Sequence, residues 1–438
     1  MYSLSNVTSR LRFTPVDTNV IHNIVYYNGT ESEPAHVNHR LDIWIPPTPS
    51  PSPQSTESTT NIQSQKIPIV IHVHGGGWQR GNKNNEWRGG PNIGRCVAKE
   101  NMIGVVISYR LAAPSIYVLL LRCLILAILI SIPLSFIIKK SYLKVFSITY
   151  VLIIPIMFLI GRYFYKQPIH IDHMLEDVCR AITYVREHIE EHCQQADINS
   201  IYLSGHSAGA HLISLLVLNP EYFKKNQIKN PYSFIKVDDE SMIALGNEID
   251  SKAYEWLQKV IKSQIVQLNA FIFVGSNSTL VTNVPLIFCS CKCDLKEYYC
   301  VISMSGIYSL RNPLHDEYFN FRNIFFRLMY VSSAIPTHDI LTYSPIEYII
   351  KHEQQNDTDK NLHHVPFLVL SAQMDLGLEI DAQRFVSKLK QHHYYVEYYI
   401  IPKTSHATIA SQFPKYDSHK HYFEFIKKIQ TQTIIMSQ

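Results

Sequence analysis

The chain has 438 residues, of which 46% are hydrophobic and 17% charged, and its formal net charge at pH 7 is +4. A charge balance so close to neutral, with no basic stripe along the sequence, argues against nucleic acid as a partner. Eight cysteines in a chain of this length also do not amount to a disulfide framework. The length favours two or three domains, but strands that alternate with helices predict one α/β unit with a mostly parallel, doubly wound sheet, interrupted by insertions.

The N-terminal part is expected to contribute an edge of that sheet. Residues 1–46 are predicted to form an antiparallel arm that ends in a strand from Leu41 to Pro46. Residues 47–66 are rich in Pro, Ser and Thr and nearly free of apolar side chains. Because such a segment cannot bury a core, we expect it to be a disordered loop between two strands.

A glycine-rich turn follows the next strand. Residues 67–110 predict strand, turn, helix and strand, and the first of these strands runs into His74-Gly75-Gly76-Gly77-Trp78. In α/β-hydrolases such a turn supplies backbone N–H groups to an oxyanion hole, joined by the N–H of the residue after the nucleophile. The expected donors are Gly76, Gly77 and Ala208. His74 and Trp78 are expected to hold the turn in place.

Residues 111–167 are predicted to be an inserted membrane hairpin. The apolar run over residues 116–138 contains Arg122 as its only charge, and at about 1.5 Å per residue it spans a hydrocarbon core of about 30 Å. A basic turn with three lysines leads to a second apolar helix at about residues 145–165, which ends in aromatic residues beside Arg and Lys, as in an interfacial belt. Two such helices predict a multi-pass protein of the endoplasmic reticulum or another endomembrane, in contact with membrane lipids.

The behaviour of this hairpin is left open by the sequence. Arg122 and Pro133 are also compatible with an apolar lid over the active site, or with a hairpin that dips into the bilayer without crossing it. The lysines of the turn favour a cytosolic turn and a lumenal catalytic domain, but the basic residues that flank the hairpin nearly balance them. The first 20 residues lack the apolar segment of a secretory signal, so internal helices would have to direct insertion.

Residues 168–219 carry the strongest catalytic signal. An amphipathic helix between Met174 and Ile189 leads to an apolar strand, which runs into Gly205-His206-Ser207-Ala208-Gly209 before a second helix. Strand, sharp turn and helix are the setting of a nucleophile elbow, in which the residues two before and two after the serine must be very small. The turn exposes the Ser207 hydroxyl, and the helix N-terminus favours developing negative charge. His206 is expected to pack beside the site and not to act as a base.

Residues 220–298 are predicted to be a second insertion, either a cap over the active site or a surface excursion, with a helix-like stretch near residues 251–268. It contains Cys289, Cys291 and Cys293, and Cys300 follows shortly after. The spacing lacks the C-x-x-C pair typical of zinc sites, and alternation would put the first three cysteines on one face of a strand. We therefore expect no metal site, with inert strand residues favoured over a redox-sensitive or acylated patch.

The other catalytic groups are expected in residues 299–438, because a hydrolase triad of this type runs in the order serine, acid, histidine. A buried strand from Val365 to Leu370 leads to Asp375, and a later strand leads to His406 in the loop before the last helix. His406 is predicted to take the proton of Ser207 and return it to the leaving group, while Asp375 fixes the imidazole tautomer. Glu379 and Asp381 lie nearby, and Asp381 is the alternative acid.

These motifs resemble the HGGGW carboxylesterase group of the α/β-hydrolases, and within it most closely the isoprenylcysteine α-carbonyl methylesterases. Arylformamidases share the HGGxW and GHSAG patterns, so the resemblance defines the enzyme group better than the substrate. It extends over roughly two thirds of the chain, through Leu41 to Pro46, His74 to Trp78, Ser108 to Arg110, Asp172 to Val178, Gly205 to His211, Ser305 to Tyr308, Phe321 to Phe326 and Tyr343 to Pro345.

The resemblance implies hydrolysis of a carboxylic ester through an acyl-enzyme and without a cofactor. Ser207, Asp375 and His406 would form the triad, with the oxyanion donors named above. The expected substrate is a lipophilic ester such as a prenylcysteine methyl ester, because a membrane hairpin would hold the enzyme where such a molecule resides. An amidase of the kynurenine formamidase type and a catalytically silent binding protein with a hydrolase fold are the alternatives. The sequence leaves the oligomeric state open.

Overall fold

The computed structural model describes residues 19–31, 33–47, 66–114, 116–138, 141–164, 169–219, 222, 269–272, 281–285, 300–310, 331, 334–335, 337–354 and 365–437. The chain divides into two units, one with residues 1–228, 297–356 and 364–438 and the other with residues 229–296 and 357–363. Most of the expected disordered loop, the helix-like stretch at residues 251–268 and Cys289, Cys291 and Cys293 lie outside the described residues.

Eight strands of the first unit form one sheet in the order β1-β2-β4-β3-β5-β8-β9-β10. The pairs β1–β2 and β2–β4 are antiparallel, and the other neighbouring strands are parallel. This is the arrangement of an α/β-hydrolase fold, so the predicted mostly parallel sheet is confirmed. The strands are β1 (Asn19–Val25), β2 (Arg40–Ile45), β3 (Ile67–Val73), β4 (Ile103–Ile107), β5 (Ala196–His206), β8 (Val301–Met304), β9 (Phe367–Met374) and β10 (Val396–Ser405).

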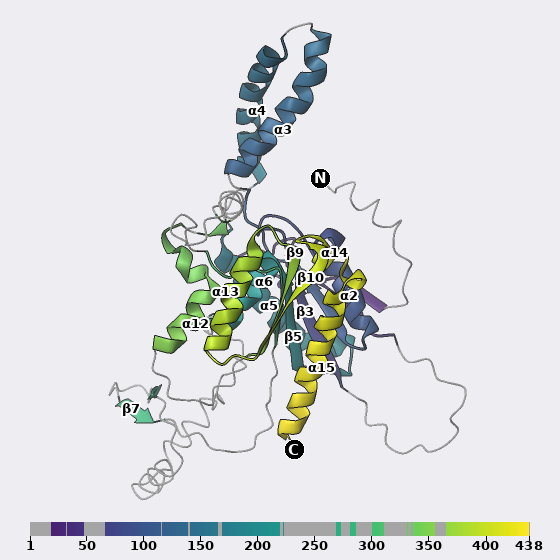
Figure 1. The fold of residues 1–438 in the computed structure, drawn as a ribbon, viewed down its shortest axis with the longest axis vertical. Coiled ribbons are helices and arrows are strands. Elements are labelled where there is room, and N and C mark those ends of the chain that lie inside the picture. Colours follow the sequence, from purple (N-terminus) through teal and green to yellow (C-terminus); the bar gives the residue numbers. More distant parts are fainter. Residues whose placement is uncertain are drawn as a thin grey trace, which may run out of the picture. The chain divides into compact units, whose positions relative to one another are not determined.

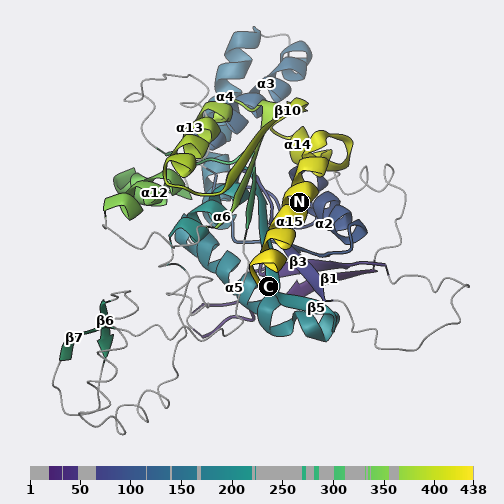
Figure 2. The ribbon, with the colours of Figure 1, turned by 60° about the horizontal axis from the view of Figure 1, so that its bottom comes forward.

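Helices cover both faces of this sheet, which is why its central strands are apolar along their length. Strand β4, for example, reads IGVVI and is buried at every position. Helices α2 (Gly90–Lys99) and α15 (Asp417–Ser437) lie on one face (Figures 1 and 2). The other face is covered by α5 (Ile171–His192), α6 (Ala208–Leu218), α12 (Pro345–Gln354) and α13 (Leu378–Gln391). Shorter elements connect these layers: η1 (Glu86–Arg88), η4 (Thr337–Tyr343), α14 (Thr408–Ser411) and η5 (Phe413–Lys415).

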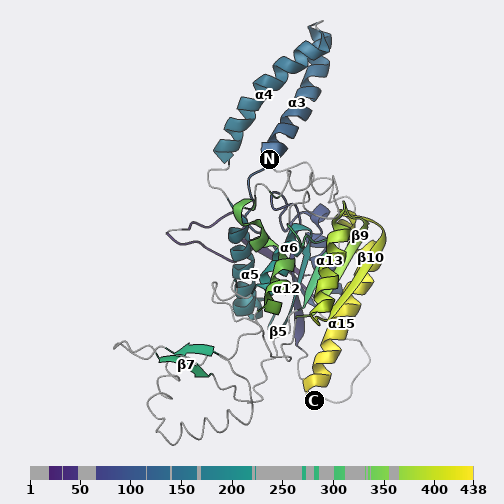
Figure 3. The ribbon, with the colours of Figure 1, turned by 60° about the vertical axis from the view of Figure 1, so that its left-hand side comes forward.

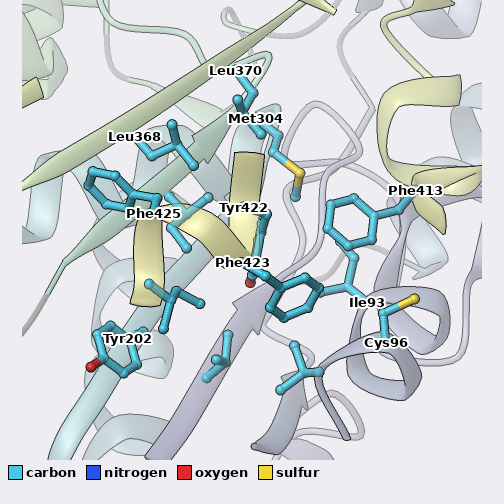
Figure 4. Packing of buried hydrophobic residues seen from close by; sticks show 14 of the residues in the cluster. Ile93, Cys96, Tyr202, Met304, Leu368, Leu370, Phe413, Tyr422, Phe423 and Phe425 are labelled. Atoms are coloured by element: carbon cyan, nitrogen blue, oxygen red, sulfur yellow. The ribbon is translucent and has the colours of Figure 1, made fainter. Parts of the chain in front are cut away.

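The core beneath α2 and α15 joins segments that are far apart in the chain (Figure 4). Ile93 of α2, Met304 of β8 and Phe423 of α15 belong to one buried cluster. Phe413 packs edge-on against Tyr422, with ring centroids 5.1 Å apart. Because α15 and Phe413 follow the loop that contains His406, burying them also fixes the position of that loop.

Two long apolar helices, α3 (Ile116–Ile137) and α4 (Tyr142–Phe164), lie against each other (Figure 3). Cys123, Ala127 and Ile153 are buried in their contact, and the small side chains of Cys123 and Ala127 let the helix backbones approach closely. Many large apolar side chains face outward; Leu129 is 63% exposed and Phe136 is 78% exposed. Among the described helices, α3 alone is long and apolar enough to cross a bilayer, over Val118–Ile137, whereas the apolar part of α4, Tyr142–Met157, is shorter.

The second of these helices begins earlier than we predicted. It starts at Tyr142 instead of near residue 145, because Lys144 lies in its first turn and not in the preceding basic turn. The backbone N–H groups of Lys144 and Val145 both donate to the carbonyl of Ser141. Lysine is a good helix former, so the positive charge of Lys144 is compatible with a place in the helix. The structure thus contains the expected pair of helices, and their crossing of a membrane stays a prediction.

In the second unit, the described residues form a two-stranded antiparallel sheet of β6 (Asn269–Ile272) and β7 (Val281–Pro285). Neither strand was predicted from the sequence. Four or five residues are too few to establish a periodic pattern against the surrounding sequence.

Candidate active site

Ser207 occupies a strained turn between the end of β5 and the start of α6. Its φ and ψ angles are 53° and −117°, a backbone conformation that residues other than glycine rarely adopt. The turn is held from both sides, since the Ser207 N–H donates to the Met304 carbonyl at 2.9 Å and the His211 N–H donates to the Ser207 carbonyl at 3.0 Å. This backbone geometry is that of a nucleophile elbow.

The two glycines of the elbow are required by close contacts. A Cβ atom on Gly205 would lie 2.6 Å from the backbone nitrogen of Ala210. A Cβ atom on Gly209 would collide with the carbonyl oxygen of Val73, the last residue of β3. The sharp turn and the close approach of α6 to β3 therefore both depend on the absence of side chains at these positions.

The structure brings Ser207, His406 and Asp375 together in one hydrogen-bonded chain. The Ser207 hydroxyl lies 2.9 Å from Nε2 of His406, and Nδ1 of His406 lies 2.7 Å from Oδ1 of Asp375. A proton on Nδ1 donates to the carboxylate and leaves Nε2 free to accept from the hydroxyl. Asp375 is buried, and its Oδ2 accepts from the backbone N–H of Ala372 at 3.2 Å. The imidazole is thus oriented in the tautomer that a general base requires.

The alternative acid, Asp381, has a different partner. Its Oδ2 accepts from the backbone N–H groups of Tyr308 and Ser309, at 2.7 and 3.2 Å. Asp381 therefore holds the loop that follows β8, while Asp375 contacts the histidine. Both carboxylates follow β9 closely in the sequence. The backbone between them directs Asp375 towards His406 and Asp381 towards the loop after β8.

The glycine-rich turn contacts the elbow directly. A Cβ atom on Gly75 would lie 3.0 Å from the Ser207 Cβ, and Gly76 and Gly77 have φ angles of 139° and 60°. A Cβ atom on Gly76 would collide with the carbonyl oxygen of Arg80. Ala208 is the first residue of α6, where backbone N–H groups have no acceptor within the helix. The predicted oxyanion donors thus lie on two turns that pack against each other beside Ser207.

Buried aromatic rings support the glycine-rich turn. Tyr109 stacks on His74 with ring centroids 4.5 Å apart, and its hydroxyl donates to the His74 carbonyl at 3.1 Å. Trp78 is fully buried and packs edge-on against His211, at 5.1 Å between centroids. These contacts are those expected of residues that position the turn.

His206, beside the nucleophile, forms a hydrogen bond with the backbone of His406. Its Nε2–H donates to the carbonyl oxygen of His406 at 2.7 Å. Burial, and secondarily the neighbouring His406, hold the pKa of His206 well below its ordinary value, so the ring stays neutral. It therefore links the elbow to the His406 loop and is not placed to act as a base.

A buried ionic cluster behind the site was not foreseen from the sequence. The carboxylate of Asp177, on α5, accepts from the Arg110 backbone N–H at 2.8 Å, from Nη2 of Arg110 at 2.7 Å and from Nε2 of His39 at 3.1 Å. Burial alone would raise the pKa of Asp177, but the hydrogen bonds from His39 and Arg110 bring it below its ordinary value. The Asp172 to Val178 and Ser108 to Arg110 motifs contain Asp177 and Arg110, but nothing in their spacing showed that these two residues pair with each other and with His39.

The described residues contain no group of three or more His, Cys, Asp and Glu side chains placed to hold a metal ion. Cys300, the described member of the cysteine-rich stretch, is fully buried next to β8. Burial raises the pKa of its thiol far above the ordinary range, which disfavours the reactive thiolate.

The family model BD-FAE matches residues 59–119, which include the glycine-rich turn. No curated protein matches the chain. A carbohydrate esterase from gut microbiota, in truncated form, is 13% identical with a TM-score of 0.48, over 95% of this chain and 99% of that one. Esterase 2 from Thermogutta terrifontis is 13% identical with a TM-score of 0.46, over 95% of this chain and 97% of its own.

At these identities and TM-scores the similarity to solved structures does not extend to substrate or mechanism. The geometry around Ser207 is that of acyl transfer by a serine nucleophile. Together with the matched family segment it supports an enzyme that hydrolyses carboxylic esters.

The two nearby carboxylates provide a matched pair of variants. Asp375→Asn should lower kcat for a short-chain aryl ester by about 10³- to 10⁴-fold, because the amide no longer holds the imidazole in the tautomer that accepts from Ser207. Asp381→Asn keeps a side-chain oxygen for the N–H groups of Tyr308 and Ser309 and should stay within about tenfold of the wild type. Steady-state kinetics of both variants would show the reverse order if Asp381 were the triad acid.

The buried histidines near the site should make the fold sensitive to acid. Burial lowers the pKa of His72 to about 3 and those of His74 and His211 to about 4. In the unfolded chain each returns to its ordinary value of about 6.5. Unfolding therefore takes up protons below that pH. Stability is complete above about pH 6.5 and falls towards about pH 4, by up to about 1.4 kcal/mol per pH unit for each histidine.

Chemical denaturation between pH 7.5 and 4.5 would measure this effect. We expect the midpoint to fall with pH, and His211→Gln to make the fall shallower because one proton fewer is taken up. Ser214→Ala, at another buried position of the same helix, changes no titrating group and should keep the wild-type slope. A slope that His211→Gln leaves unchanged would contradict the prediction.

Proposed function

We propose that the protein is a membrane-anchored serine esterase that cleaves a lipophilic carboxylic ester through an acyl-enzyme on Ser207. The observation that carries this proposal is the hydrogen-bonded chain from the Ser207 hydroxyl through His406 to Asp375, at 2.9 and 2.7 Å. The serine sits in a strained turn at the N-terminus of α6, where strain is maintained by surrounding contacts and is typical of functional positions.

The reaction follows from this arrangement. Oγ of Ser207 attacks the ester carbonyl carbon while its proton moves to Nε2 of His406. The carbonyl oxygen becomes an oxyanion, to which the N–H groups of Gly76, Gly77 and Ala208 donate. The tetrahedral intermediate expels the alkoxide, which leaves as an alcohol with the proton from His406. Water then attacks the acyl-enzyme, gives a proton to His406, and the acid departs as this proton returns to Ser207.

Membrane anchoring is proposed from the surface of the helical pair. Val118–Ile137 of α3 has the length and composition of a spanning helix, and Leu121, Ile125, Leu129, Ile132 and Phe136 are exposed along it. On α4, Leu143, Ile148, Val151, Leu152, Ile156 and Leu159 are exposed as well. An apolar surface of this extent is unfavourable in water and matches lipid chains. We propose a multi-pass hairpin in the endoplasmic reticulum or another endomembrane.

A prenylcysteine methyl ester is the substrate we favour, because the chain resembles isoprenylcysteine methylesterases and because such an ester partitions into the membrane. A formamide is the alternative, since the same acyl-transfer machinery cleaves amides. A silent binding protein is disfavoured by the complete Ser–His–Asp set.

Kinetics with three substrates in detergent would test the activity. We expect the highest kcat/KM for a farnesylcysteine methyl ester, a lower value for a short-chain aryl ester, and the lowest for an N-formyl arylamine. Ser207→Ala should lower turnover of each by about 10³-fold or more. Ser214→Ala, which removes a buried hydroxyl elsewhere on α6, should keep wild-type rates. Near-normal turnover in Ser207→Ala would refute the assignment of the nucleophile.

Alkaline carbonate extraction would test the anchor. The full chain should stay in the membrane pellet, because carbonate strips peripheral proteins and not apolar helices that reside in lipid. Replacing residues 116–164 with a short Gly/Ser linker should release an active enzyme into the supernatant. Complete extraction of the full chain would favour the apolar-lid alternative.

A further inference from the structure

We propose that the active site opens at the bilayer surface and takes its ester directly from the membrane. The substrate class is an amphiphile whose chain stays in the hydrocarbon while its ester carbonyl lies at the interface. This inference rests on the proposed anchoring of α3 and α4, and it follows from where these helices join the hydrolase fold.

The helical pair and the catalytic residues share one edge of the sheet. The parallel strands β3, β4, β5, β8, β9 and β10 all end at this edge. The elbow follows β5, Asp375 follows β9 and His406 follows β10. The chain leaves for α3 after the end of β4, and it returns from α4 into the start of α5, which leads back to the opposite end of β5. Both junctions of the insertion therefore lie at the catalytic edge.

The outgoing junction is bound to the oxyanion turn. We call residues 108–112 the strap. The N–H of Ala112 donates to the carbonyl of Trp78 at 2.8 Å, next to Gly77. Earlier strap residues are fixed as well: the Ser108 carbonyl accepts from the Tyr26 hydroxyl at 2.8 Å, and Arg110 is held by Asp177 as described above. The strap is thus a rigid part of the site up to four residues before α3.

The returning junction is bound to the nucleophile helix. The carboxylate of Asp172, in the first turn of α5, accepts from the Tyr343 hydroxyl at 2.6 Å. The Tyr343 carbonyl in turn accepts from Nε2 of His211 at 2.7 Å, one helical turn after Ser207. Asp172 is therefore linked to α6 through one intervening residue.

Chain length then limits how far the site can lie from the base of the hairpin. From Ala112 to Ile116 is four residues, which span at most about 14 Å when fully extended. From Phe164 to Ile171 is seven residues, or at most about 25 Å. The headgroup layer of a bilayer is about 5–8 Å thick on each side. If the helices reside in lipid, the strap and the oxyanion turn are confined to the vicinity of that layer, so a membrane-dissolved ester need not enter water to reach Ser207.

Longer junctions would separate the site from the bilayer without removing the anchor. We would insert about 12 Gly/Ser residues after Pro114 and the same number between Phe164 and Ile171, which adds a flexible reach of about 20 Å at each junction. The matched control carries the same insertion after Pro47, between β2 and β3. Turnover of a long-chain fluorogenic ester in phosphatidylcholine vesicles is compared with that of a short-chain soluble ester.

The spacer variant should hydrolyse the vesicle-embedded ester at least about tenfold more slowly than the wild type, with soluble-ester turnover within about twofold. The control insertion should leave both rates unchanged. An anchored spacer variant with wild-type rates on both esters would overturn the inference while leaving the proposed function intact. A wild-type enzyme that cleaves neither ester, or that leaves the membrane in carbonate, would refute the proposed function itself.

A second measurement covers the case in which the spacers disturb folding. A fluorophore is placed on a non-canonical amino acid at Met374, which is 61% exposed at the catalytic end of β9. In a second sample it is placed at Glu191, which is 65% exposed near the end of α5 that leads into the opposite edge. Headgroup-attached nitroxide lipids should quench position 374 at least about twofold more strongly than position 191. Equal or reversed quenching would overturn the inference.

Discussion

The turn at Ser207 is the constraint on which the rest of the site depends. A serine at φ 53° is stable because β5 is held in the sheet, α6 starts directly behind it, the Met304 carbonyl accepts from the serine N–H, and the Val73 carbonyl lies against Gly209. Glycines at positions 205 and 209 make that closure sterically possible. The resulting turn points a hydroxyl at Nε2 of His406 and puts the first N–H of α6 beside it. The strained backbone conformation therefore fixes the position of the nucleophilic hydroxyl.

A second layer of contacts makes this arrangement rigid. The glycine-rich turn packs on the elbow at Gly75, Tyr109 stacks behind it, and the buried pair of Arg110 and Asp177 ties the following segment to α5. Breaking a buried pair of this kind leaves an uncompensated charge, which typically destabilises a protein by about 3–5 kcal/mol. His206 adds a direct link from the elbow to the backbone of His406. The oxyanion donors, nucleophile and base are thus positioned by several buried contacts around the elbow.

Much of this site could be predicted from the sequence, because its key residues lie within or directly after short sequence motifs. The elbow and the glycine-rich turn are short motifs with strict steric requirements, and His406 follows a recognisable strand. The sequence favoured Asp375 over Asp381 only because Asp375 directly follows β9. The hydrogen bonds of Asp381 to the N–H groups of Tyr308 and Ser309 became visible only in the folded structure. The pairing of Asp177 with Arg110 and His39 joins residues up to 138 positions apart, which no local pattern encodes. The predicted start of α4 lay later than the observed one because Lys144 was assigned to the basic turn, although lysine is a good helix former.

Ser207 is an activated nucleophile in this structure because His406 and Asp375 accept and stabilise its proton. The most direct measurement is peptide mass spectrometry of the folded, membrane-embedded protein after reaction with a fluorophosphonate, which phosphonylates activated serines by displacement of fluoride. We expect one stoichiometric adduct on the peptide that contains Ser207, slowed by a competing ester substrate and absent from Ser207→Ala. An unmodified Ser207 in folded wild-type protein, or an adduct on another serine, would contradict it.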